Sequence, residues 1–132
     1  MKILITGGLG FIGSHLVSEL GQTHDVDILD GFTTEYVGFK YIHRGTKGLE
    51  ECNLIEQQHR IQALRYRLQL IKNKHRTIHR CNSFEMLPED EYDLIINCGA
   101  LSEAILSQHF PEFTFESIYT GLAQIKETYQ NT

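Results

Sequence analysis

A glycine-rich turn near the N-terminus places the tightest constraint on how this chain folds. Gly7, Gly10 and Gly13 follow the apolar run Ile3-Leu4-Ile5 and precede a segment with helical character. The first glycine permits a tight turn, the second lets the main chain approach a pyrophosphate, and the third lets the helix pack closely on the strand. The N-terminus of such a helix favours an anion, because its amides are unpaired and its dipole is positive there. The turn therefore predicts a dinucleotide site; the alternative is a glycine-rich turn without a ligand.

An acidic residue stands at the end of the second predicted strand. The apolar positions within Val26–Leu29 indicate a strand over residues 25–30, and Asp30 closes it seventeen residues after Gly13. In dinucleotide-binding folds an acid at this place accepts the adenosine ribose hydroxyls and repels the 2′-phosphate of NADP. We therefore expect the cofactor to be NAD, with Asp30 in contact with its ribose.

Composition argues against several other classes of function. The chain has 132 residues, which suits a single domain over residues 1–132. Its formal net charge of −5 does not suit a protein that binds the phosphates of nucleic acid. No apolar stretch approaches the roughly 20 residues that a membrane-spanning helix needs. The three cysteines lack Cys-x-x-Cys spacing, and residue 1 leads directly into a strand. We therefore expect a reduced, cytoplasmic setting, with no nucleic-acid or membrane partner.

The rest of the chain continues the alternation of strands and helices. We expect strands over residues 2–6, 25–30, 77–79 and 94–96, the last of them buried, and helices over residues 11–20, 49–74, 103–108 and 113–130, with a break at Pro111. The long helix would measure roughly 40 Å and extend past a small sheet, and its basic residues are interpreted as a solvated face. These elements predict an α/β fold: a partial Rossmann fold with a parallel sheet of about four strands in the order 3-2-1-4, flanking helices and one long helix.

Three kinds of side chain that often carry chemistry are interpreted here as inactive. Tyr36 and Lys40 have the Tyr-x-x-x-Lys spacing of a dehydrogenase acid/base pair, but they fall in a glycine-punctuated loop near the adenosine end. The histidines form no metal-ligand face, so no metal site is expected. Cys98 has no neighbour in the sequence that would activate a thiolate, and is interpreted as a packing residue. We therefore expect no catalytic residue in this chain.

Beyond these single features, the sequence resembles the extended short-chain dehydrogenases, and among them the NAD-dependent sugar-nucleotide epimerases and dehydratases of the UDP-glucose 4-epimerase group. The resemblance depends on residues 6–17 with the glycine turn, on Asp30, and on residues 93–100 at the fourth strand. Residues 115–122 are similar to the family segment that ends in Thr-Gly-Leu. Residues 35–76 match only as a variable crossover.

The resemblance implies a role for each matching residue. The amides of Phe11 and Ile12 would contact the pyrophosphate beside the three glycines of the turn. Further contacts are implied at the adenosine ribose for Asp30 and Gly31, at adenine for Asn82 and Ser83, and at the nicotinamide-side ribose and phosphate for Cys98, Gly99 and Ala100.

Departures from the family pattern narrow what the resemblance implies. Asn82 replaces an aspartate and brings no charge, and Ile118 stands where the family often has an asparagine near the nicotinamide. The family's fifth strand, catalytic Tyr-x-x-x-Lys and sugar-nucleotide domain have no counterpart in residues 1–132. We therefore expect the NAD-binding part of an epimerase or dehydratase, which would take a nucleotide sugar only if a missing segment completes it. The alternative is a non-catalytic module that binds an adenine dinucleotide or serves in assembly.

Two surfaces predict self-association as a homo-oligomer or binding of a protein partner. Without a fifth strand, the strand over residues 94–96 is an apolar edge that invites another strand. The long helix carries an apolar stripe with heptad-like spacing, formed by Leu54, Ile61, Leu64, Leu68 and Ile71. The alternative is that the stripe packs on the sheet and that the last helix or the loop over residues 101–112 covers the edge.

Overall fold

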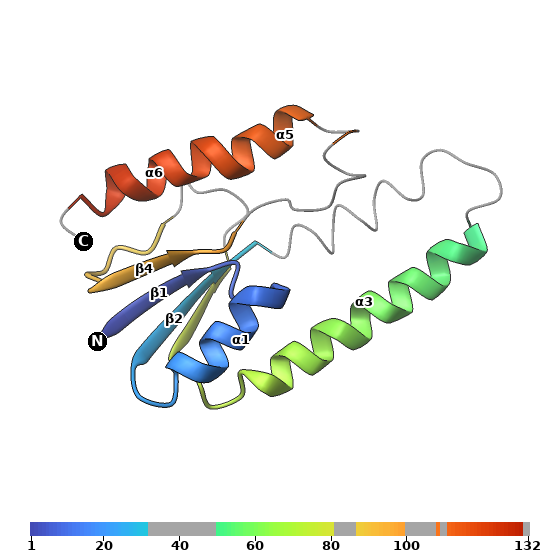
Figure 1. Ribbon diagram of the computed structural model, residues 1–132, viewed down its shortest axis with the longest axis horizontal. Helices are drawn as coiled ribbons and strands as arrows, with labels where there is room; N and C mark the ends of the chain where they lie inside the picture. The colour runs from blue at the N-terminus through green and yellow to red at the C-terminus, as the bar shows by residue number, and fades with distance from the viewer. Residues whose placement is uncertain (32–49, 81–86, 100–107, 109–110, 131–132) are drawn as a thin grey trace.

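A four-stranded parallel sheet with helices on both faces forms the centre of the molecule (Figure 1). The computed structural model describes residues 1–31, 50–80, 87–99, 108 and 111–130. The strands are β1 (Lys2–Thr6), β2 (Asp25–Asp30), β3 (Thr77–Arg80) and β4 (Leu94–Asn97). Their order, β3-β2-β1-β4, confirms the predicted order 3-2-1-4.

The central strand β1 has neighbours on both sides and helices over both of its faces. Ile5 is in register with Ile28 of β2 on one side and with Ile96 of β4 on the other. Ile3, Leu4 and Ile5 are fully buried. A continuous apolar run is what such a parallel strand requires, because neither face meets water.

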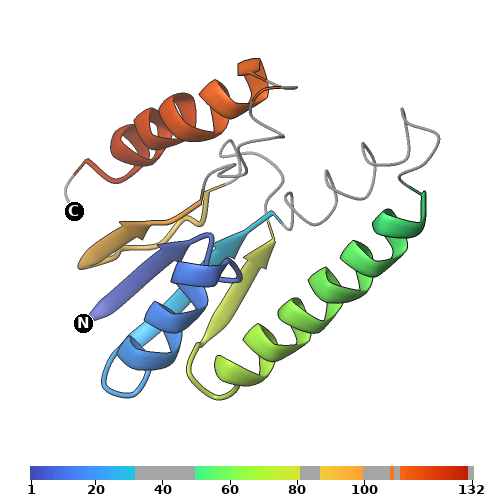
Figure 2. The same ribbon diagram turned by 45° about the vertical axis from the view of Figure 1, so that its right-hand side comes forward.

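The first face of the sheet is covered by two helices, α1 (Phe11–Leu20) and α3 (Glu50–Leu70), which lie side by side in Figures 1 and 2. Val17 of α1 and Ile71, directly after the end of α3, belong to a core of seven buried residues, against which Leu64 of α3 packs. The seven are Ile3, Ile5, Leu9, Val17, Val26, Ile28 and Ile71. The N-terminal part of α3 extends past the sheet, as its predicted length required.

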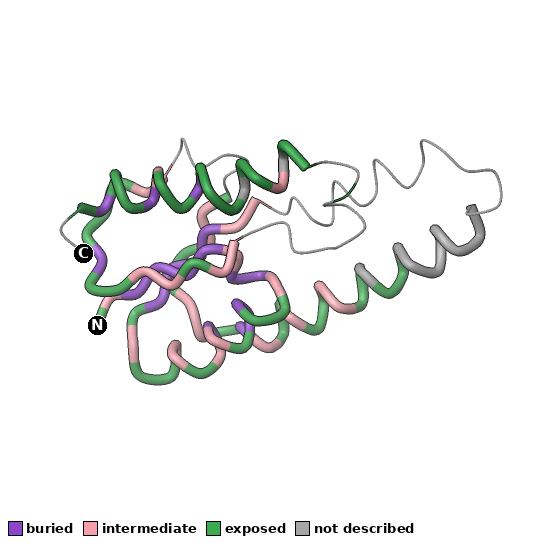
Figure 3. Tube along the Cα trace, turned by 45° about the horizontal axis from the view of Figure 1, so that its top comes forward, coloured by how far each residue is buried: buried purple, intermediate pink, exposed green. Residues whose placement is uncertain are grey.

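The second face is covered by the C-terminal helical segment, which consists of α5 (Pro111–Phe115), a π-helical turn η2 (Glu116–Thr120) and α6 (Gly121–Thr128). The buried residues of this segment lie in and just after α6, whereas the described residues of α5 and η2 are mostly exposed (Figure 3). Ile125 and Tyr129 pack with Leu4, Leu29 and Tyr92 in a second core.

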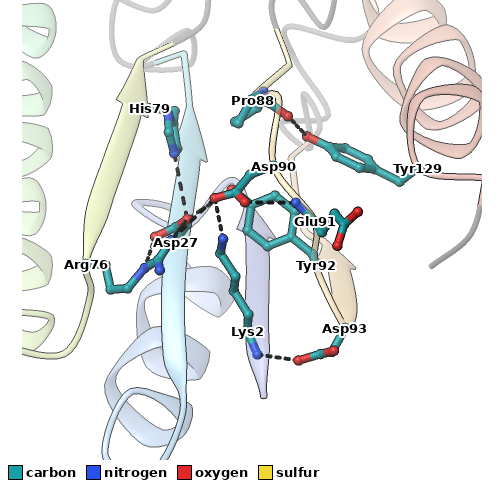
Figure 4. Close-up of polar contacts among 10 residues, drawn as sticks. All are labelled: Lys2, Asp27, Arg76, His79, Pro88, Asp90, Glu91, Tyr92, Asp93 and Tyr129. Carbon is teal, nitrogen blue, oxygen red and sulfur yellow. Dashed lines mark hydrogen bonds and ion pairs between the residues drawn. The ribbon is translucent and has the colours of Figure 1, made fainter.

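A buried carboxylate also lies on this second face. Asp27, in the middle of β2, is only 1% exposed and accepts hydrogen bonds from Arg76 at 3.0 and 2.7 Å and from the Tyr92 hydroxyl at 3.0 Å (Figure 4). Burial raises the pKa of Asp27, but the hydrogen bonds from Arg76 and Tyr92 outweigh it, so the pKa lies below its usual value. Asp27 therefore stays ionised and connects β2 with the segments that lead into β3 and β4.

Some predicted boundaries differ from the structure. The long helix ends at Leu70 rather than at residue 74, because the chain turns there and Asn73 takes a left-handed conformation with φ 62°. Helix α5 begins at Pro111 rather than at residue 113, since a proline is tolerated where its missing N–H has no helical partner. Residues 109–110, directly before it, lie outside the described residues. Of the short helix predicted over residues 103–108, only Gln108 is described, and it is helical.

The strand predicted to be buried, β4, is only partly so. Leu94 is 39% exposed, because β4 lies at the edge of the described sheet. The predicted stripe on α3 is also divided: Leu64 packs against the core, whereas Ile61 and Leu68 are 43% and 40% exposed. Among the described helices, none is both long and apolar enough to cross a membrane.

Candidate functional site

The glycine turn connects the carboxyl end of β1 to α1. Gly7 has φ +65°, and its amide donates to the Leu29 carbonyl at 2.7 Å. The Gly10 amide donates back to the Gly7 carbonyl at 2.9 Å, which closes the turn. The predicted tight turn is therefore present at Gly7, at a backbone conformation that L side chains rarely adopt.

Close packing excludes a side chain at two glycines of the turn, Gly7 and Gly13. An added Cβ at Gly7 would lie 2.7 Å from the Gly99 nitrogen, and one at Gly13 would lie 2.1 Å from the Gly7 carbonyl oxygen. At Gly10 the nearest atom, the Gly7 oxygen, would be 3.1 Å away. Gly7 and Gly13 are thus required by the packing of the protein itself. Gly10 is less tightly packed, and because it has no side chain it leaves the outer side of the turn uncovered.

The first turn of α1 offers amides without a competing acid. Its N-cap is Gly10, which provides no side-chain cap, and the first turn contains no acidic residue. Phe11 and Ile12 follow with side chains 71% and 66% exposed. Amides at the positive end of the helix dipole, with no carboxylate beside them in the helix, suit an anion such as a pyrophosphate.

The carboxylate of Asp30 lies beside the turn. One of its oxygens, Oδ2, accepts a hydrogen bond from the Leu9 amide at 2.9 Å. Gly31 directly follows it at the end of β2. The residue predicted to contact the ribose therefore also shapes the turn predicted to hold the pyrophosphate.

The segment after β4 meets the turn from the other side. The Cys98 amide donates to the Thr6 carbonyl at 3.1 Å, and the Gly99 amide donates to the Thr6 hydroxyl at 3.1 Å. That hydroxyl in turn donates to the Asn97 side chain. Burial raises the pKa of the Cys98 thiol, and its side chain packs against the first core, so the interpretation as a packing residue is supported.

The structure brings nine of the predicted contact residues to one edge of the sheet, where the carboxyl ends of β1, β2 and β4 meet: Gly7, Gly10, Phe11, Ile12, Gly13, Asp30, Gly31, Cys98 and Gly99. Because β2 and β4 lie on opposite sides of β1, this edge is the topological switch point at which open α/β sheets bind ligands. Asn82, Ser83 and Ala100 lie outside the described residues, as do Tyr36 and Lys40.

Sequence reasoning missed two residues at this edge. Thr6 holds the start of the 98–99 segment with its hydroxyl, and Arg67 donates from Nη1 to the Leu9 carbonyl at 3.3 Å. Arg67 is 58 residues from Leu9, and its only sequence signal is a helix rich in basic residues. Such a long-range contact depends on tertiary packing, which periodicity does not reveal.

The described residues at this edge carry groups suited to binding a nucleotide. Amides of the turn and of the first turn of α1 are hydrogen-bond donors, the Asp30 carboxylate is an acceptor, and Gly10 carries no side chain; this combination fits a dinucleotide. Within the described ranges, no three histidine, cysteine or acidic residues are grouped to hold a metal ion.

Comparison with known proteins agrees with this geometry. The sequence matches the NAD dependent epimerase/dehydratase family over residues 3–130. Among curated protein sequences, none matches the chain significantly.

Solved structures with the same fold include several epimerases. A UDP-glucose-4-epimerase from Stenotrophomonas maltophila, with bound NAD and formylated UDP-arabinopyranose, superposes with a TM-score of 0.64 at 21% identity over 98% of this chain and 33% of its own. A UDP-glucuronic acid 4-epimerase from Bacillus cereus, in complex with UDP-glucuronic acid and NAD, gives 0.63 at 19% identity over 100% of this chain and 37% of its own. The chain thus spans about a third of the length of these structures.

Proposed function

Because the chain belongs to the NAD dependent epimerase/dehydratase family, we propose that it is an NAD-binding domain of a sugar-nucleotide epimerase or dehydratase. The observation that carries the proposal is a hydrogen bond: the amide of Leu9, in the middle of the glycine turn, donates to the carboxylate of Asp30. The turn presents helix amides to a pyrophosphate, and the acid stands where the adenosine ribose would lie.

Each part of the edge has a proposed role in holding the cofactor. The Phe11 and Ile12 amides bind the pyrophosphate, and Gly10 allows its close approach. Asp30 and Gly31 hold the adenosine ribose, and Cys98 with Gly99 borders the nicotinamide-side ribose and phosphate. We assign the remaining contacts to three residues outside the described ranges, Asn82, Ser83 and Ala100. The bound NAD would supply hydride acceptance, while this chain binds and orients it.

We propose no turnover of a sugar by residues 1–132 alone. An epimerase needs a positioned acid/base group, and Tyr36 with Lys40 is the one Tyr-x-x-x-Lys pair in the sequence. That pair comes soon after β2 in the sequence, whereas the pair of the family comes well after the fourth strand. A nucleotide sugar would therefore be a partner only together with a further segment that supplies the acid/base pair and the sugar site.

The competing proposal is a non-catalytic module that binds an adenine dinucleotide. It would use the same edge, so binding alone does not separate the two. The next open reading frame separates them: a Tyr-x-x-x-Lys segment followed by a sugar-nucleotide domain favours the enzyme, and its absence favours the module.

Two further proposals concern the setting of the chain. We propose a cytoplasmic location, supported by cysteines without Cys-x-x-Cys spacing. We also propose a homo-oligomer, supported by the exposed Ile61 and Leu68 on α3 and by Leu94 on the edge strand.

The test of NAD binding is a fluorescence titration with NADH. Gly10→Val places a branched side chain on the bare side of the turn and should weaken binding by at least about tenfold, because the pyrophosphate can no longer approach. Gln22→Val, at an exposed position just beyond α1, should bind NADH like the unmodified chain. Equal affinity of Gly10→Val and the unmodified chain would contradict the proposed site.

A further inference from the structure

The Leu9 peptide groups are held from two sides by opposite charges. The Leu9 amide donates to the Asp30 carboxylate at 2.9 Å, and the Leu9 carbonyl accepts from the Arg67 guanidinium at 3.3 Å. The Leu9 side chain is 2% exposed and belongs to the first core. This central residue of the glycine turn is therefore fixed at its amide, its carbonyl and its side chain.

The position of Arg67 is set by apolar residues that pack against the core before and after it, at the end of α3. Leu64, one turn before it, packs against the first core, and Ile71, four residues after it, is fully buried in that core. Leu64 lies three residues before Arg67 and therefore on the same side of α3, and Ile71, directly after the end of α3, donates its amide to the Arg67 carbonyl at 3.1 Å. These two apolar anchors hold the end of α3 against the core and bring Arg67 to the turn. The sequence interpretation of the basic residues as a solvated face holds for Arg65, which is exposed, but is wrong for Arg67.

A hydrogen bond from a guanidinium is stronger than one between neutral groups, and its loss leaves the carbonyl of a buried residue without that donor. The carbonyl in question belongs to the peptide that joins Leu9 to Gly10, directly before the amides of α1. A change in its orientation would therefore turn Gly10 and the following amides away from a bound pyrophosphate.

We infer that Arg67 is a positioning residue for the cofactor: it makes α3 part of the dinucleotide site by fixing the Leu9–Gly10 peptide. The inference rests on the proposed function and adds to it a coupling between two elements. Coupling between sites is reciprocal, so NAD binding also stabilises the docking of the C-terminal part of α3 on the turn.

The first measurement uses the protein without NAD. Arg67→Met keeps a long apolar stem but removes the donor, and Arg65→Met makes the same replacement on the exposed side of α3. In NMR amide exchange, we expect the Leu9 amide to exchange about tenfold faster in Arg67→Met, because the turn opens more often, and at the unmodified rate in Arg65→Met.

The second measurement is calorimetric titration of the same proteins. NAD should bind Arg67→Met about tenfold more weakly than the unmodified chain, and Arg67→Lys should recover part of the loss because it keeps the charge and a donor. Adenosine lacks the pyrophosphate, so its affinity should be unchanged in all variants. A merely structural role for Arg67 would lower both affinities together.

The outcomes separate this inference from the proposed function. Failure of the unmodified chain to bind NAD would overturn the proposed function, and the inference with it. Normal NAD binding by the unmodified chain with equal binding by Arg67→Met would overturn the inference alone, whether or not Leu9 exchange changes. Parallel losses for NAD and adenosine would also overturn it.

Discussion

Gly13 stands in the tightest contact of the nucleotide turn. An added Cβ would lie 2.1 Å from the Gly7 carbonyl oxygen. This oxygen belongs to the backbone and cannot move aside as the end of a flexible side chain would. We expect Gly13→Ala to lower the free energy of unfolding by about 1–3 kcal/mol, as overpacked sites do. Urea denaturation would measure it, and an unchanged midpoint would contradict the packing described here. Ser18→Ala, on the same helix and only half-buried, is the control.

The role of a single residue could be predicted from the sequence where its contacts are with neighbours in the chain, and not where its partners are distant in the chain. The roles of Gly7 and Gly13 follow from a turn whose residues are neighbours in the chain, so their spacing was enough to predict it. Asp27 and Arg67 were missed because their partners lie 49 and 58 residues away. A charge inside the apolar run of β2 was the one available signal for Asp27, and it does not identify the partner.

At the scale of the elements, hydrogen bonds of Asp27 connect β2 to the segments before β3 and β4. This carboxylate bonds to Arg76 before β3 and to Tyr92 before β4 (Figure 4). We expect Asp27→Asn to lower the free energy of unfolding by about 1–3 kcal/mol at pH 7, because the charge-assisted hydrogen bonds are lost. Asp25→Asn, at an exposed position on the same strand, should change it by less than about 0.5 kcal/mol.

The difference between Asp27→Asn and the unmodified protein should depend on pH. The pKa of Asp27 is lowered in the folded state, so its ionised form stabilises the fold above the unfolded pKa of about 3.9. This stabilisation is lost as the pH falls through the lower folded pKa. Chemical denaturation at pH 7 and at several values below 4 should therefore show the two proteins converging at acid pH. A constant difference across that range would contradict an ionised Asp27.

Element boundaries were predictable where local signals end them. The strands and α1 were placed within about one residue, since apolar runs and glycines delimit them. The end of α3 was not, because Ile71 continues the apolar periodicity although the chain has already left the helix to bury it. The exposure of Leu94 depends on the absence of a neighbour beside β4 in the described sheet, which the run Leu94-Ile95-Ile96 does not reveal.

For the molecule as a whole, the exposed apolar side chains of α3 predict self-association. Leu68 is 40% exposed on a helix that extends past the sheet, so Leu68→Glu should weaken a dimer without harming the core. Gln69→Glu adds the same charge at the neighbouring exposed position and serves as control. Analytical sedimentation at about 100 μM should detect the oligomer. A monomer for the unmodified chain and for both variants would contradict this prediction.

The most direct test of the account is the choice between NAD and NADP by calorimetric titration of the unmodified chain. Asp30 lies where the adenosine ribose is proposed to bind, and its charge opposes a 2′-phosphate. We expect NAD to bind and NADP to bind at least about tenfold more weakly, with the difference reduced in Asp30→Asn. NADP binding equal to or tighter than that of NAD would contradict the role of Asp30, and the absence of any NAD binding would contradict the proposed function itself.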